Sequence, residues 1–444
     1  MIRIFFAAFV FLLPWHALFV TYLKCKAGID PTFLRFWKEI TLLVVFITTV
    51  FWVLSKKHWN LSKILKDNTV VWLSIAFTLC SLVYVFFPYF TIKPSSVLGF
   101  KYDVFFLFAL VVGLYIPSLR KDPSLFLKSV FTSTGLIVGI FLSWYLFFDI
   151  KTTTEIFGFS DAVSTYNAQS CLSFSQNVNG HHRFQATFGW PIRFSVFVVM
   201  AYILYLGYML DKKYLNPLIK YSFVWIVGII TIIAVIFSYT KTSLLGLIFT
   251  LWVFWYMSWK YIYRGKLKKI YLLWGGGIGF LGLMSIAIAK KDLFLHLWAM
   301  INRLDNLSKS VEMFFYNPIG YGLGIAGPAT QIGRSMESAW GWQISTAAPT
   351  NIATFLPENW YVQILLEQWL VWLWIFLSLL CVIAYELFLL VKSKKDFYSI
   401  ALFSIFVWVM FMGLFTHVYE EAATSYILFL LVWIHLGSSS KIYH

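Results

Sequence analysis

Polar side chains gather just before an apolar segment in the last quarter of the chain. The segment 369–391 is almost entirely apolar, and four polar residues come shortly before it: Glu358, Asn359, Gln363 and Glu367. Asn359, Gln363 and Glu367 follow one another at intervals of four, so they share one face of a helix that runs on into this segment. Glu358 could accept a proton from a hydroxyl group as a general base. Alternatively, Glu358 only stabilises the start of the helix, and the polar stripe only joins neighbouring helices.

Four basic residues elsewhere could bind an anion near that carboxylate: Arg183, Arg193, Lys241 and Arg303. Lys241 stands in the short link 238–243 between two apolar runs, where the exposed N–H groups of a helix start would add to its charge. Arginine holds a phosphate through two hydrogen bonds, so these positions indicate a phosphate or diphosphate site. In the alternative interpretation, Lys241 reaches out to the bilayer edge and Arg193 pairs with a carboxylate such as Asp161 or Glu420.

The elements that position these residues are expected to be membrane helices. The chain has 444 residues, of which 60% are hydrophobic and 12% are charged. Unbroken apolar runs of about 18 or more residues indicate membrane-spanning helices, and they exclude a barrel, whose strands alternate. About twelve such runs are present: 4–23, 39–55, 69–88, 102–117, 127–148, 191–210, 221–239, 242–259, 270–288, 369–391, 399–416 and 422–438. The sequence therefore predicts an all-α polytopic membrane protein with residues 1–444 in one integral membrane domain.

The net charge of +16 is explained by topology and does not indicate a nucleic-acid partner. Most basic residues lie in short links that follow alternate spans, and such links stay in the cytoplasm. Both termini are then expected in the cytoplasm and the long loops 149–190 and 289–358 on the external face. Within the second loop, Leu293–Val311 has the apolar spacing of an amphipathic surface helix.

Other patterns carry less weight. Gly322 and Gly324 belong to a G-x-G-x-x-G pattern, but a dinucleotide site requires a preceding strand, and none is expected here. The histidines and the four cysteines show no convincing metal-ligand spacing. Cys25 and Cys171 both fall on the predicted external face, so either a disulfide or two free thiols is consistent with the sequence.

Several of these segments occur in the order found in one family of membrane proteins. The segments are Arg183-Phe-Gln-Ala-Thr-Phe-Gly-Trp-Pro191, Tyr239-Thr-Lys-Thr-Ser-Leu-Leu-Gly246, Asn317-Pro-Ile-Gly-Tyr-Gly-Leu-Gly324 and Pro357-Glu-Asn-Trp-Tyr-Val-Gln-Ile-Leu-Leu-Glu367. With the twelve-span layout, residues 180–390 resemble the O-antigen ligase and polymerase superfamily of bacterial envelope glycosyltransferases. Each motif is degenerate alone, and their order carries the resemblance.

The resemblance implies transfer of a glycan from a polyprenyl-diphosphate carrier to a hydroxyl acceptor, such as a lipid A core or another glycan. The reaction would take place on the external face of the bacterial cytoplasmic membrane, by direct displacement, with neither metal nor cofactor. Arg183 and Lys241 match the family positions that hold the diphosphate, although the second is usually arginine. Asn359, Tyr361, Gln363 and Glu367 would wall the cavity, with Gly322 and Gly324 in support.

The position that holds the proposed base in the ligases is commonly histidine, and this chain has Glu358 there. That departure leaves a polymerase of the same superfamily open. A polysaccharide flippase or another transporter is the alternative outside the enzymes. Transporters often show two related halves, whereas here the long loops and unusual polar groups gather on one predicted face. The sequence therefore favours a transferase.

Overall fold

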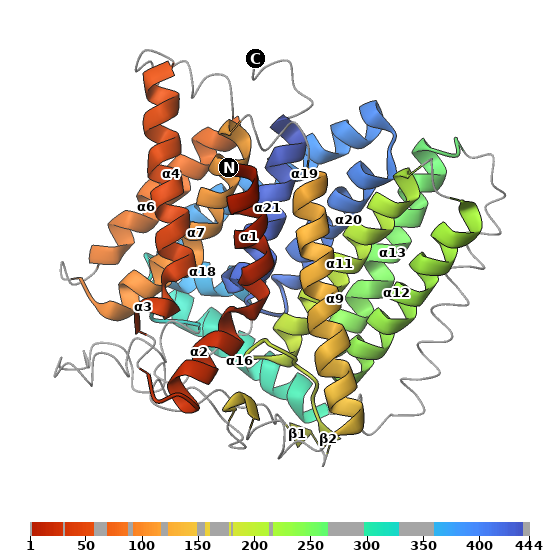
Figure 1. Cartoon of the computed structure of the whole chain (residues 1–444). Coiled ribbons are helices and arrows are strands. Elements are labelled where there is room, and N and C mark those ends of the chain that lie inside the picture. The colour runs from red at the N-terminus through yellow and green to blue at the C-terminus, as the bar shows by residue number, and fades with distance from the viewer. Residues whose placement is uncertain are drawn as a thin grey trace.

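The computed structural model describes residues 2–29, 32–56, 69–87, 92–116, 123–148, 156–159, 177–178, 181–212, 216–264, 297–327 and 359–437. It is an α-helical bundle (Figure 1), as predicted, and the described strands are two-residue segments, β1 (Asn177–Val178) and β2 (His181–His182), paired antiparallel. Short helical elements in the described part are η1 (Leu13–Trp15), α3 (Thr32–Arg35) and η3 (Val418–Glu420).

Nine helical segments of the described residues are long and apolar enough to cross a membrane. They are α1 (Ile2–Leu12) continued through η1 into α2 (His16–Cys25), α4 (Trp37–Lys56), α6 (Thr69–Phe86), α7 (Pro94–Tyr115), α9 (Ser124–Phe147), α11 (Pro191–Asp211), α12 (Pro217–Phe237), α13 (Lys241–Tyr261) and α19 (Leu370–Lys394). Two shorter apolar helices, α20 (Phe397–Met412) and α21 (Ala422–Gly437), match two further predicted spans. The span predicted at 270–288 lies outside the described residues. A membrane-embedded helical protein is therefore confirmed, without a count of twelve.

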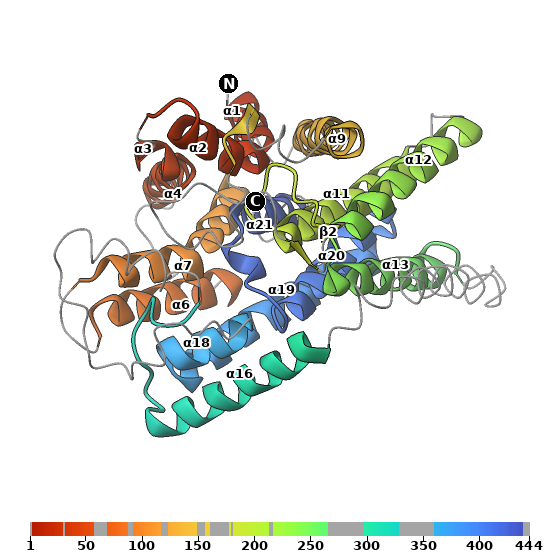
Figure 2. The same ribbon diagram turned by 90° about the horizontal axis from the view of Figure 1, so that it is seen from below.

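Helix α16 (Leu297–Tyr316) lies across one end of the bundle (Figures 1 and 2), which we call the α16 end. The helix predicted at 293–311 is thus present and continues to Tyr316, where Asn317 and Pro318 end it. It packs against the short helix α18 (Trp360–Gln368). Helix α2, whose last residue is Cys25, lies on the same side of the bundle in Figure 1. Cys25 is disulfide-bonded, Cys80 and Cys381 are free thiols, and Cys171 lies outside the described residues.

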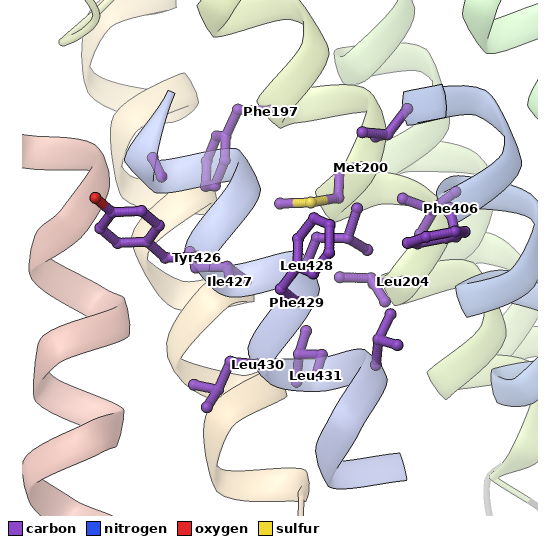
Figure 3. Packing of buried hydrophobic residues seen from close by; sticks show 14 of the residues in the cluster. Phe197, Met200, Leu204, Phe406, Tyr426, Ile427, Leu428, Phe429, Leu430 and Leu431 are labelled. Atoms are coloured by element: carbon purple, nitrogen blue, oxygen red, sulfur yellow. The ribbon is translucent and has the colours of Figure 1, made fainter. Parts of the chain in front are cut away.

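Helix α21 forms the centre of the bundle, and every one of its residues is buried. Figure 3 shows its side chains packed against Phe197, Met200 and Leu204 of α11 and Phe406 of α20. On another side α21 packs closely on α7, because a Cβ atom on Gly113 would stand only 2.8 Å from the Leu430 carbonyl oxygen. This tightly packed centre fixes where α7, α11 and α20 present their ends.

The expectation that the polar helix after Glu358 continues into the next span is wrong. Helix α18 ends at Gln368, Trp369 has a φ of 81°, and α19 begins at Leu370. The backbone N–H of Gly322 donates to the Glu367 carbonyl at 3.0 Å, and Tyr321 does the same to Leu366 at 2.8 Å. The last carbonyls of α18 thus accept hydrogen bonds from a turn that is distant in the sequence. They are not available to the N–H groups that follow Trp369, so the helix ends before that residue.

Candidate functional site

Arg183 and the link before Lys241 lie together at the α16 end. The Arg183 guanidinium donates from Nε to the Ser238 carbonyl at 3.0 Å and from Nη2 to the Thr240 hydroxyl at 3.1 Å. The Phe184 N–H extends this contact by donating to the Phe237 carbonyl at 2.8 Å. Since Lys241 is the first residue of α13, these bonds hold the guanidinium next to a helix start that carries a lysine. The Arg183 guanidinium thus contacts Thr240, the residue directly before Lys241.

The start of α13 has no side-chain cap. Thr240 occupies the N-cap position of α13, but its hydroxyl does not cap the helix. The hydroxyl instead donates to the Ser238 carbonyl at 3.2 Å and accepts from Arg183, so it faces away from the α13 amides. Thr242 lies inside the helix. Tyr239 has a φ of 48°, a strained conformation for a bulky residue that is typical of functional turns.

Arg193 stands in the first turn of α11, the helix next to α13. The two helix starts are joined by a 2.7 Å hydrogen bond from the Ser195 hydroxyl to that of Ser243, each two residues beyond the basic residue of its helix. The Arg193 guanidinium pairs with the Glu421 carboxylate at 3.3 Å, with side chains 28% and 19% exposed. The sequence left open an ion pair between Arg193 and a carboxylate such as Asp161 or Glu420. The structure shows an ion pair, and the partner of Arg193 in it is Glu421. Asp161 lies outside the described residues.

The polar run before α19 divides into three parts. Glu358 lies outside the described residues. Asn359 caps α18 by accepting from the Val362 N–H at 3.1 Å, and the Tyr361 hydroxyl donates to the Met410 carbonyl at 2.6 Å. Gln363 and Glu367 are fully buried. Asn359 and Tyr361 therefore fix the start of α18, and only Gln363 and Glu367 remain as an interior polar pair.

The glycine turn 320–327 covers this interior pair. The Ala326 N–H donates to Glu367 Oε1 at 2.9 Å. Gly322 and Gly324 have φ values of 93° and 74°, and a Cβ atom on Gly324 would stand 2.0 Å from the Ser95 carbonyl oxygen. Both glycines thus let the turn pass between α7 and α18. Their predicted role in supporting a ligand cavity stays a prediction.

Arg303 lies in α16, but its side chain is outside what the structure describes. The helix itself is placed beside α18 at the α16 end. Whether the Arg303 guanidinium belongs with Arg183 and Lys241 stays a prediction.

A pocket that the sequence did not predict opens beside Arg193. It is lined by Arg193, Thr416, His417, Glu421 and Thr424, together with aliphatic side chains. Glu420 lies behind it, with its Oε1 3.7 Å from His417 Nδ1. Burial raises the pKa of the Glu420 carboxyl from its ordinary 4.5 to about 7, although Arg193 opposes the shift. Burial and the charge of Arg193 lower the pKa of the His417 imidazole from 6.5 to about 3.

A second group of charges, also not predicted, lies where α4 and α7 begin. Glu39 pairs with Lys38 at 3.1 Å and with Lys101 at 2.9 Å, and all three are largely buried. His16 Nε2 lies 2.8 Å from the Lys38 Nζ. Lys38 is also close enough to Glu421 for their charges to interact, so this group adjoins the pocket.

The end of α18 is held by a third buried polar set. The Gln368 amide donates to Asp103 Oδ2 at 2.6 Å, and its carbonyl oxygen accepts from the Ser81 hydroxyl at 2.8 Å. These bonds tie α18 to α7 and α6, which fixes Gln363 and Glu367 relative to Glu420. Within the described residues, no group of three or more histidine, cysteine, aspartate or glutamate side chains could hold a metal ion.

Only one sequence signal could have indicated the pocket. Glu420 and Glu421 are adjacent acidic residues in a short link between two apolar runs, but charges in such a link are usually solvated. Folding buries Glu420 because α7, α11 and α18 all converge on it. In comparisons with known proteins, the chain matches no protein-family model and no curated protein.

Proposed function

We propose that the protein is a membrane glycosyltransferase that moves a glycan from a polyprenyl-diphosphate carrier to a hydroxyl acceptor. The observation that carries the proposal is the Arg183 side chain bonded to Ser238 and Thr240, which sets a guanidinium beside Lys241 at the start of α13. A diphosphate leaving group gains negative charge as its bond to the sugar breaks, and fixed cations and helix N–H groups stabilise that charge. Arg193 on the adjoining helix adds a third cation.

The reaction would take place on the external face of the cytoplasmic membrane of a bacterium. Cys25 is disulfide-bonded, and disulfides persist in oxidising compartments. Helix α2, which ends at Cys25, lies on the same side of the bundle as α16 and as the starts of α11 and α13 (Figure 1). This supports an external position for the cations and agrees with the distribution of basic residues in the links. Two acceptors are compared. Transfer to a lipid A core would indicate a ligase, and transfer to a growing glycan would indicate a polymerase.

Binding and transfer test the proposal directly. The purified full-length protein is given lipid-linked glycan extracted from cells that lack the gene, together with a hydroxyl acceptor. The readouts are glycan transfer and release of undecaprenyl diphosphate. Arg183→Ala and Lys241→Ala should each weaken binding of undecaprenyl diphosphate by about 10- to 100-fold, the loss expected for one charged hydrogen bond.

Lys260→Ala is the matched control, because Lys260 lies at the other end of the same helix, over the Tyr261 ring. It should bind undecaprenyl diphosphate as the unmodified protein does. Unchanged affinity in both Arg183→Ala and Lys241→Ala would contradict the proposed donor site. Glu358→Gln is assayed beside them, since the sequence makes Glu358 a candidate base.

One observation favours a transporter as the second candidate. Asp103 is fully buried in α7, about midway along a helix long enough to span a membrane, and buried acids at such depth often mark transport paths. Liposomes that contain the protein and a fluorescent undecaprenyl-diphosphate lipid separate the two functions. Movement of the lipid between leaflets without glycan transfer would favour the transporter. Transfer without such movement would favour the enzyme.

A further inference from the structure

The pocket beside Arg193 contains several buried polar atoms without partners. Within the described part of the chain, both ring nitrogens of His417, both carboxylate oxygens of Glu420 and the hydroxyl of Thr424 make no hydrogen bond. A buried polar atom left unpaired costs about 1–3 kcal/mol. So many in one place indicate a site that water or a polar ligand completes. The pocket has a volume of about 10 Å³, enough for one water molecule or one hydroxyl group, and its lining combines a guanidinium, a carboxylate, an imidazole and hydroxyls that could hydrogen-bond to such a group.

This pocket adjoins the proposed diphosphate site. Arg193 lines it and lies on α11, whose first turn is joined to that of α13 through Ser195 and Ser243 at 2.7 Å. Lys241 is the first residue of α13. A donor held by the cations would therefore present its reacting carbon near the Arg193 side of the pocket. A second reactant in the pocket would approach it from the side of His417.

We propose that this pocket receives the acceptor hydroxyl, that His417 is the catalytic base that removes its proton, and that Glu420 is the positioning residue behind His417. The inference rests on the proposed function and deepens it, because it assigns the acceptor half of the site. It also replaces Glu358, the base expected from the sequence, with a residue outside every motif of the resemblance.

The step is balanced as follows. The acceptor oxygen forms a bond to the anomeric carbon, and the bond from that carbon to the diphosphate oxygen breaks with its electron pair left on the diphosphate. The acceptor proton passes to His417 Nε2, the ring nitrogen that is not near Glu420. The other nitrogen, Nδ1, carries its hydrogen toward Glu420, whose negative charge stabilises the imidazolium. The separation of 3.7 Å between His417 Nδ1 and Glu420 Oε1 would have to shorten in the complex with substrate, as catalytic hydrogen bonds often do.

The electrostatics of the pocket fit these roles. With its pKa lowered to about 3, His417 is neutral at physiological pH but weakly basic, so proton transfer to its ring requires the negative charge of an ionised Glu420 to stabilise the imidazolium. With its pKa raised to about 7, Glu420 becomes ionised as the pH rises through neutrality. Activity should therefore rise between about pH 6 and pH 8. The groups that act on Glu420 come from every neighbouring element: Arg193, Lys101, Asp103, Gln363, Glu367 and Glu421.

The test measures His417→Ala and His417→Gln in the transfer assay. Both variants should lose about 10²- to 10⁴-fold in kcat, the usual contribution of a general base. They should bind undecaprenyl diphosphate normally, and added imidazole should partly restore His417→Ala. Glu420→Gln should lower kcat and abolish the rise in activity between pH 6 and pH 8.

His435→Gln is the matched control, because His435 is also buried but lies near the far end of α21, 2.7 Å from the Ser399 hydroxyl. Loss of transfer in His417→Gln but not in His435→Gln supports the inference. Transfer at the unmodified rate by both His417 variants overturns it and leaves the proposed function intact, as does an unchanged pH profile in Glu420→Gln. Should the unmodified protein bind no undecaprenyl diphosphate and transfer no glycan, both proposals fall together.

Discussion

At the end of the bundle away from α16, half-buried carboxylates complete helix ends, whereas near the α16 end the buried carboxylate of Glu420 has no hydrogen-bond partner among the described residues. Asp211 accepts from the N–H groups of Phe397 and Tyr398 at 3.0 and 2.8 Å, and Asp396 caps α20 by accepting from Ser399. Glu420, by contrast, accepts no hydrogen bond from the described residues. The first arrangement stabilises the fold. The second costs stability and is therefore the one to expect at a site of chemistry.

The largest effect is expected where the glycine turn holds the α16 end together. Gly324→Ala should lower the free energy of unfolding by about 4 kcal/mol, since it adds overpacking to a left-handed backbone. Its Cβ would stand 2.0 Å from the Ser95 carbonyl at a φ of 74°. Gly28→Ala isolates the backbone cost, because Gly28 has a φ of 66° with no atom within 4 Å of the added Cβ. Thermal unfolding in detergent measures both, and equal small losses would show that the turn does not hold α18 in place.

Replacing the unpaired carboxylate should stabilise the protein. Folding raises the pKa of Glu420 from 4.5 to about 7, so the folded state loses stability as the pH rises between those values. Glu420→Gln does not ionise, so above pH 7 it should be more stable than the unmodified protein by up to about 3 kcal/mol. Below pH 4.5 the difference should vanish. Thermal unfolding at pH 8 and pH 4.5 measures it, and a destabilised variant at pH 8 would contradict the comparison.

The helical layout could be predicted from the sequence because lipid requires long apolar runs. The runs at 399–416 and 422–438 became α20 and α21 within a few residues of their predicted bounds. The break at Trp369 could not be predicted, because it depends on hydrogen bonds from Tyr321 and Gly322, over 40 residues away. Local sequence shows only a polar helix followed by an apolar one.

Only part of the candidate site could be predicted from the sequence. Arg183 and Lys241 stand out because basic residues at a membrane edge are costly, and the fold does bring Arg183 to the link before Lys241. His417 and Glu420 look like ordinary link residues in the sequence. Their significance depends on burial by α7, α11 and α18, and burial among distant helices leaves no local pattern.

The smallest effect, with the opposite sign to that of Glu420→Gln, should come from the far end of the bundle. Asp211→Asn keeps one acceptor oxygen but turns an amide NH₂ toward a backbone N–H, so it should cost about 1–3 kcal/mol at pH 8. Glycan transfer, measured at a temperature where both proteins are folded, should be unchanged. Asp211→Asn and Glu420→Gln make the same chemical change at two carboxylates, of which Asp211 is half-buried and hydrogen-bonded and Glu420 is buried without a hydrogen bond from the described residues. If Asp211→Asn and Glu420→Gln both destabilised the protein, or both abolished transfer, the comparison would be wrong. The two ends of the bundle would then not differ in the way that their hydrogen bonds indicate.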